Sequence, residues 1–80
     1  MKVAVIGAGS TYTPELVSGL ERDRERLDVT ELALMDPDAD RLAVVGGLVQ
    51  RMLAAQDSAT RVVSTTQRAE ALEGADAVLV

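Results

Sequence analysis

Two glycines and a carboxylate stand at positions that suit the binding of a nucleotide. Gly7 and Gly9 directly follow a short apolar run, and two hydroxyl side chains come next. A glycine at the first position permits a tight turn, and one at the second lets backbone N–H groups approach a pyrophosphate at the positive end of a helix. Asp36 ends a second apolar run, near the spacing of roughly 20 residues at which a carboxylate meets an adenosine ribose. The predicted dinucleotide-binding residues are therefore Gly7, Gly9, Ser10, Thr11 and Asp36.

The glycine pattern departs from the common dinucleotide fingerprint at one position. The third glycine of G-x-G-x-x-G would fall at position 12, where this chain has Tyr12. A bulky ring there implies a wider turn or a shifted helix start. The hydroxyl of Thr13 adds a third candidate donor to phosphate, beside those of Ser10 and Thr11. The alternative interpretation is a glycine turn of any α/β protein, with Asp36 as a turn residue before Pro37.

The carboxylate also predicts which dinucleotide is preferred. A 2′-phosphate would place a second negative charge beside Asp36, which favours NAD over NADP. Arg41 lies close in sequence and could approach such a phosphate or stack on adenine, so we add it to the candidate cofactor-binding residues.

Alternating apolar runs and amphipathic segments predict the elements that position this site. Strands are expected at residues 2–6, 30–35, 61–65 and 76–80, and helices at 14–26, 38–55 and 67–73, the first with Thr13 as N-cap. This order predicts an α/β fold, a Rossmann-like parallel sheet flanked by helices. Because such a domain has six strands, we expect residues 1–80 to be its N-terminal part, truncated at about the fourth strand, with the catalytic and substrate domain absent from the chain.

Composition narrows the function classes. The net charge of -5 argues against a nucleic-acid surface, and the absence of Cys and His removes the usual metal ligands and nucleophile–base pairs. No segment has the length of a membrane span or a signal peptide, so a cytoplasmic protein is expected. The mixed charges of residues 21–26 predict a solvated helix end. No catalytic or metal-binding residue is assigned.

The glycine segment also resembles a known family. Val5-Ile6-Gly7-Ala8-Gly9-Ser10-Thr11-Tyr12-Thr13-Pro14-Glu15-Leu16-Val17 is similar to the N-terminus of the family 4 glycoside hydrolases, especially their 6-phospho-β-glucosidase branch. The segments at 34–52 and 68–78 fit the same family. Its loop has the order G-x-G-S followed by Thr-Tyr-Thr-Pro, which accounts for Tyr12.

The resemblance implies an unusual glycosidase, of bacterial carbohydrate metabolism, that depends on NAD and a divalent metal ion, typically manganese. In this family, NAD⁺ oxidises the sugar C3 hydroxyl, the aglycone is eliminated, water adds and the hydride returns. The resemblance places Gly7, Gly9, Ser10 and Thr11 in the phosphate-binding loop, Asp36 at the ribose and, more weakly, Arg41 nearby. The expected partners are a dinucleotide, a phosphorylated disaccharide or glucoside, and further copies in a homo-oligomer. The metal ligands and the base would lie beyond residue 80, so this chain alone is expected to be inactive.

Two other functions stay open at this stage. An NAD-dependent 2-hydroxy-acid dehydrogenase shares this N-terminal architecture, although the Ser-x-Tyr-Thr-Pro segment argues against it. A non-catalytic nucleotide-binding module would explain the short length and the missing catalytic groups.

Overall fold

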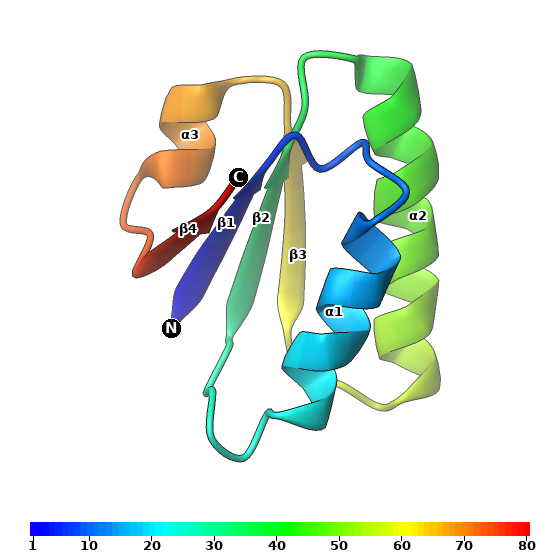
Figure 1. Cartoon of the computed structure of the whole chain (residues 1–80), viewed down its shortest axis with the longest axis vertical. Coiled ribbons are helices and arrows are strands. Elements are labelled where there is room, and N and C mark those ends of the chain that lie inside the picture. Colours follow the sequence, from blue (N-terminus) through cyan, green and yellow to red (C-terminus); the bar gives the residue numbers. More distant parts are fainter.

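Four parallel strands and three helices make up the computed structural model, which describes all 80 residues (Figure 1). In chain order the elements are β1 (Lys2–Ile6), α1 (Thr13–Arg22), β2 (Glu31–Met35), α2 (Ala39–Ala55), β3 (Arg61–Thr65), α3 (Arg68–Leu72) and β4 (Ala77–Leu79). The strands lie in the order β3-β2-β1-β4. The predicted parallel α/β fold is confirmed, with each strand within one residue of its expected bounds. None of the helices combines the length and apolar composition needed to cross a bilayer.

The two faces of the sheet carry different side chains, because successive residues of a strand point to opposite faces. One face packs against α1 and α2, and its buried strand residues are Val3, Val5, Leu32 and Leu34. The other face packs against the short helix α3, and it presents the small residues Ala4 and Ala33 together with Met35. The small side chains let Ala71 of α3 approach the sheet closely, where it is 1% exposed. The sheet is thus covered by helices on both sides.

Helix α2 forms where the second helix was predicted and buries one apolar face. Leu42, Val49 and Leu53 are buried against the sheet, and Val45 is partly buried beside them. The carboxylate of Asp38 caps the helix by accepting hydrogen bonds from the N–H groups of the first turn.

Helix α1 ends at Arg22, four residues earlier than predicted. The N–H groups of Arg26 and Leu27 both donate to the carbonyl oxygen of Asp23, which folds the chain into a turn. This turn returns Val29 to the apolar core before β2 begins. The early end of the helix thus goes together with partial burial of Val29, which the composition of the charged run did not predict.

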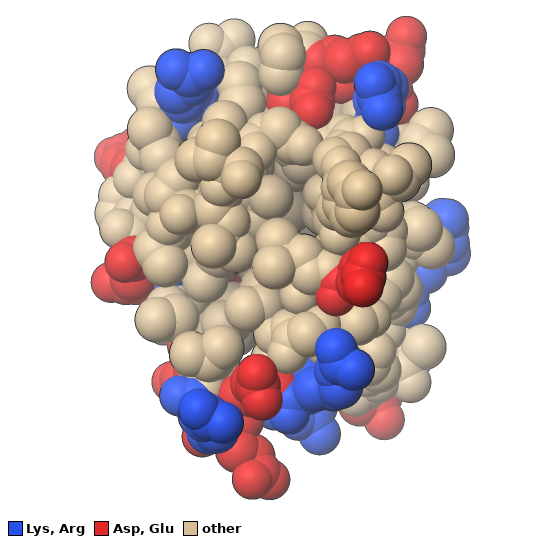
Figure 2. Space-filling model, viewed as in Figure 1, with Lys and Arg blue, Asp and Glu red and all other residues tan.

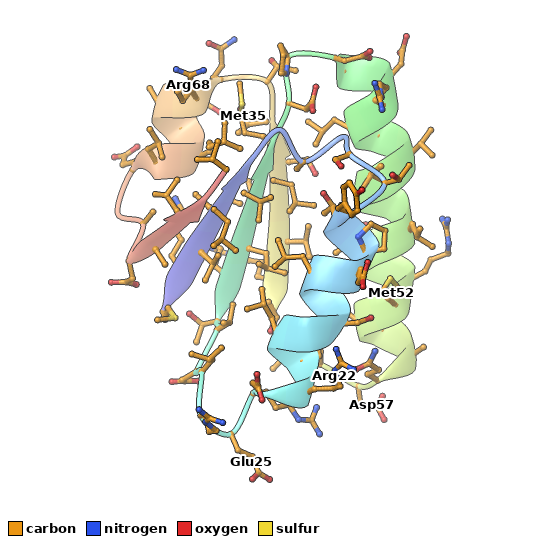
Figure 3. All side chains as sticks on the ribbon, in the orientation of Figure 1. Arg22, Glu25, Met35, Met52, Asp57 and Arg68 are labelled. Atoms are coloured by element: carbon orange, nitrogen blue, oxygen red, sulfur yellow. The ribbon has the colours of Figure 1, made fainter.

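The prediction that residues 21–26 are solvated is wrong for Glu21. Residues 22–26 are exposed as predicted, but the Glu21 side chain is only 7% exposed. Its Oε1 atom accepts a hydrogen bond of 2.8 Å from the Ser58 hydroxyl and a longer one from Thr60. Figure 3 shows Arg22, Glu25 and Asp57 at the end of the molecule where the strands begin, opposite Arg68. The charged run is therefore remote from the glycine loop.

Candidate functional site

The turn after β1 is fixed by one backbone oxygen of the neighbouring strand. Gly7 has a φ of 81°, a conformation that side chains other than glycine rarely adopt, so the predicted need for a glycine in the turn is confirmed. The N–H groups of Gly7 and Ala8 both donate to the carbonyl oxygen of Met35, each over 2.8 Å. The loop therefore lies across the carboxyl end of β2, next to Asp36.

The Asp36 carboxylate joins the two connections that leave β1 and β2. Its Oδ2 atom accepts the N–H of Gly9 at 2.8 Å, and its Oδ1 atom accepts the N–H of Asp38 at 2.9 Å. The hydrogen bond from Asp38, then that from Gly9, and the charge of Arg41 hold the pKa of the Asp36 carboxyl below its usual range. An ionised carboxylate with lone pairs to spare stands at the carboxyl end of the sheet.

Gly9 leaves space for the side chains opposite it. A Cβ atom at this position would lie 2.8 Å from Oδ2 of Asp36 and 3.1 Å from Cβ of Arg41. The sequence suggested a different reason for this glycine, the approach of its backbone to a pyrophosphate. In the structure its N–H is already bonded to Asp36, and the missing side chain makes room for that contact.

The hydroxyl side chains of the loop divide into two groups. Ser10 Oγ accepts the N–H of Tyr12 at 3.1 Å, which leaves its own proton free for a ligand. The proton of Thr13 is not free, because its hydroxyl donates to the carbonyl oxygen of Ala8 at 2.8 Å and the side chain is buried. The expectation that Thr13 caps α1 or contacts phosphate is therefore wrong. The residue at the N-cap is Tyr12, whose side chain makes no capping hydrogen bond.

The start of α1 keeps two unpaired backbone donors. The N–H groups of Thr11 and Glu15 have no acceptor, whereas those of Thr13 and Leu16 are bonded within the turn. Pro14 has no N–H and fits the first turn of the helix. Free donors at the positive end of a helix favour an anion.

Arg41 lies on the outer side of the loop. Its exposed side chain lines a cavity of about 340 Å³ together with Gly9, Thr11 and Val44. The guanidinium is close enough to Asp36 to favour its ionised form. The structure thus brings all six candidate cofactor-binding residues to one end of the sheet.

A second hollow lies where the strand order reverses. β1 lies between β2 and β4, and the helices α1 and α3, which precede β2 and β4, pack on opposite faces of the sheet. Such a reversal of strand order is the usual ligand position in an open α/β sheet. A cavity of about 290 Å³ opens there, lined by residues that include Gly7, Ser10, Tyr12 and Leu79. Figure 2 shows this face largely without charge over β4 and β1, with Lys, Arg, Asp and Glu mainly around its edge. An uncharged groove thus adjoins the start of α1, where the unpaired N–H donors lie.

Comparison with known proteins identifies the family. The model of the family 4 glycosyl hydrolases matches residues 2–80. This chain belongs to the family 4 glycosyl hydrolases. The resemblance read from the glycine segment is thereby confirmed, and the dehydrogenase alternative is not favoured.

Relatives of this family 4 chain are named for different activities. It is 40% identical over 80 residues to a probable 6-phospho-beta-glucosidase of Bacillus subtilis, covering 98% of this chain and 18% of the relative. It is 41% identical over 75 residues to an alpha-galactosidase of Rhizobium meliloti, covering 92% and 15%. The chain therefore spans less than a fifth of the length of these relatives.

A solved structure has the same fold. The 6-phospho-beta glucosidase of Thermotoga maritima, in a form with manganese, NAD⁺ and glucose-6-phosphate, matches with a TM-score of 0.88 and 33% identity. The match covers 98% of this family 4 chain and 18% of the solved chain.

Metal ligands are not grouped in this chain. No cluster of three or more His, Cys, Asp or Glu side chains is arranged to hold a metal ion. The residues present thus do not fit a manganese site.

Sequence reasoning missed three parts of the site. Two of them, the carbonyl oxygen of Met35 and the N–H of Asp38, are backbone groups. Every residue except proline has both a backbone N–H and a carbonyl, so the residue type gives no sign of their role. The anchoring role of Thr13 had a signal, a hydroxyl beside a buried turn, but the same signal suits a helix cap.

Proposed function

We propose that residues 1–80 are the N-terminal NAD-binding part of a 6-phospho-β-glucosidase that depends on NAD and a divalent metal ion, manganese. One observation carries the proposal: unpaired N–H donors at the start of α1 lie on the same loop whose Gly9 bonds the Asp36 carboxylate. The donors suit a pyrophosphate and the carboxylate suits a ribose, and both lie at the carboxyl end of a parallel sheet.

The residues present fit the dinucleotide. Thr11 and the Ser10 hydroxyl would donate to the pyrophosphate, and Gly7 would shape the turn that presents them. Asp36 has one lone pair left on each oxygen after its two backbone bonds, so it can accept both ribose hydroxyls. Arg41 would border the adenosine. Bound NAD⁺ would supply the hydride acceptor of the reaction.

The substrate class rests on the relatives. The Bacillus subtilis and Thermotoga maritima proteins support a phosphorylated β-glucoside, which the whole protein would cleave by oxidation, elimination, addition and reduction. The metal ligands and the catalytic base would come from outside residues 1–80, because this chain has no metal-binding cluster. The chain alone would therefore be inactive.

The same chemistry suggests the cellular location and the partners of the protein. NAD and sugar phosphates are cytoplasmic metabolites, so we place the protein in the cytoplasm. We also propose a homo-oligomer: the exposed Val63 and Val78 on the α3 face of the sheet are apolar groups that the rest of the domain or a further copy would cover. With its negative charge the chain would not bind nucleic acid.

Calorimetric titration of the full-length protein with NAD⁺ and NADP⁺ tests the proposal. The wild type should prefer NAD⁺, and Asp36→Ala should weaken NAD⁺ binding by about tenfold while relaxing the preference, because charged hydrogen bonds to the ribose are lost. Glu25→Ala removes an exposed carboxylate at the opposite end of the molecule and is the control. Equal affinities for the two cofactors, unchanged by Asp36→Ala, would mean that Asp36 is only a turn residue.

A further inference from the structure

Gly9 lies close to the side chains of Asp36, directly after β2, and Arg41, in the first turn of α2. Its N–H bonds Asp36 Oδ2 at 2.8 Å, and the position its Cβ would take lies 2.8 Å from the same oxygen. Real Cβ atoms do not approach an oxygen that closely, so a side chain here would displace the carboxylate or the loop. The Cβ of Arg41 would also lie 3.1 Å from that position and crowds it further.

The contact also orients the carboxylate. Asp36 accepts one backbone N–H on each oxygen, from Gly9 and Asp38, and these two bonds fix the plane of the carboxylate. A rotation that broke either bond would leave a polar N–H of a constrained loop without its acceptor. The lone pairs that remain are therefore held in fixed directions before any ligand binds.

We propose that Gly9 is a specificity-determining residue: its missing side chain lets the loop hold the Asp36 carboxylate in the orientation that accepts the ribose diol and opposes a 2′-phosphate. Gly9 acts through Asp36 and is a positioning residue. The cofactor part of this inference rests on the proposed function. It differs from the usual role of a second glycine, which is to bring its own backbone to the pyrophosphate.

Two glycines of the chain separate this mechanism from others. Gly7 has open space around its missing Cβ but a φ of 81°, so a substitution there strains the turn whatever stands at position 36. Gly19 lies in α1, where a Cβ would come no nearer than 3.9 Å to the flexible end of Arg22. Gly7→Ala is thus a control for turn strain, and Gly19→Ala is a control for the substitution itself.

The decisive experiment is a double-mutant cycle in the full-length protein, with calorimetric affinities for NAD⁺ and NADP⁺. Gly9→Ala should reduce the preference for NAD⁺ by about tenfold, roughly the worth of one charged hydrogen bond. In the Asp36→Ala background the clash with the carboxylate is gone and only the 3.1 Å contact with the Cβ of Arg41 remains, so adding Gly9→Ala should change the ratio of the two affinities by no more than about twofold. Gly7→Ala should harm both backgrounds equally, and Gly19→Ala should leave both affinities unchanged.

Two results would overturn the inference. One is an additive loss, in which Gly9→Ala weakens both cofactors by the same factor with and without Asp36, because then the bare Cα serves the pyrophosphate directly. The other is a wild-type preference for NAD⁺ that Gly9→Ala leaves intact. If Gly9→Ala alone does not fold, the double variant still decides, because it should fold and bind like Asp36→Ala.

A measurement without cofactor keeps this inference separate from the proposed function. With ¹⁵N-glycine labelling, the Gly9 amide is identified by its absence in Gly9→Ala. Its proton should resonate downfield and exchange slowly in the wild type, and Asp36→Ala should reverse both, since the carboxylate is its acceptor. An unchanged Gly9 amide would refute the contact even if NAD⁺ binds. Failure of both cofactors to bind, with a responsive Gly9 amide, would refute only the proposed function.

Discussion

The hydroxyl of Thr13 donates a hydrogen bond to the carbonyl oxygen of Ala8, 2.8 Å away, and both residues are buried. This bond spans the base of the glycine loop and ties the start of α1 to the end of the turn. The N–H of Ala8 in turn donates a hydrogen bond to the carbonyl oxygen of Met35, so both backbone polar groups of Ala8 are bonded. Ala8 is thus the point at which the loop is fixed to the fold, so that Ser10 and Thr11 are presented from a constrained backbone.

Replacing Thr13 tests this anchor. Thr13→Val keeps the shape of the side chain and leaves the carbonyl oxygen of Ala8 buried without a donor, which should lower the free energy of unfolding by about 1–3 kcal/mol. Thr13→Ser keeps the hydroxyl and should cost about 1 kcal/mol for the lost methyl group. Urea denaturation of the three proteins measures the difference. A Val variant as stable as the wild type would show that the bond contributes nothing.

The strands were predictable because continuous apolar runs such as Val3–Ile6 and Leu32–Met35 mark doubly covered strands without knowledge of the partner. The glycine turn was predictable for a similar local reason, the positive φ at Gly7. The partners of Glu21 were not, because Ser58 and Thr60 lie 37 and 39 residues away and nothing in the spacing joins them. A charged residue in a charged run gives no sign that it is buried.

Glu21 accordingly yields a prediction that the sequence alone would not suggest. Glu21→Ala removes the acceptor of the Ser58 hydroxyl and opens space beneath the residue 57–60 turn, and it should lower the free energy of unfolding by about 1–3 kcal/mol. Glu25→Ala, in the exposed part of the same run, should change it by less than about 0.5 kcal/mol. Thermal unfolding of the two variants is sufficient for the comparison. Similar melting temperatures would contradict the buried contact.

Stability should depend on pH through Asp36 and Glu31. The pKa of Glu31 is lowered chiefly by its hydrogen bond from Arg61, with a further contribution from Lys2, and the pKa of Asp36 is lowered by the N–H groups of Asp38 and Gly9. A carboxyl group whose pKa is lowered in the folded state stabilises the fold at pH values above its ordinary pKa, which is 3.8 for Asp36 and 4.5 for Glu31. This stabilisation is lost as the pH falls through the folded-state pKa.

The expected profile is therefore flat near neutral pH and falls from about pH 4.5 downward. Urea denaturation at a series of pH values measures it. Asp36→Asn and Glu31→Gln should each be less stable at neutral pH and show a shallower acid decline. Glu25→Gln is the control, because Glu25 points away from the fold at the lower end of the molecule (Figure 3). A decline of equal steepness in all four proteins would contradict the assignment.

The adjacent glycines of α2 should respond in opposite directions to the same substitution. A Cβ at Gly46 would lie 3.0 Å from the Ser64 hydroxyl of β3, whereas one at Gly47 would meet only the flexible end of Arg51 at 3.4 Å. Alanine gains about 1 kcal/mol of helix propensity at either site, but overpacking against the sheet costs about 1–3 kcal/mol. Gly47→Ala should thus raise the melting temperature and Gly46→Ala should lower it. Gly46→Ala combined with Ser64→Ala removes the opposing oxygen and should recover the gain. If Gly46→Ala alone stabilises as much as Gly47→Ala, the close approach of α2 to β3 does not depend on this glycine.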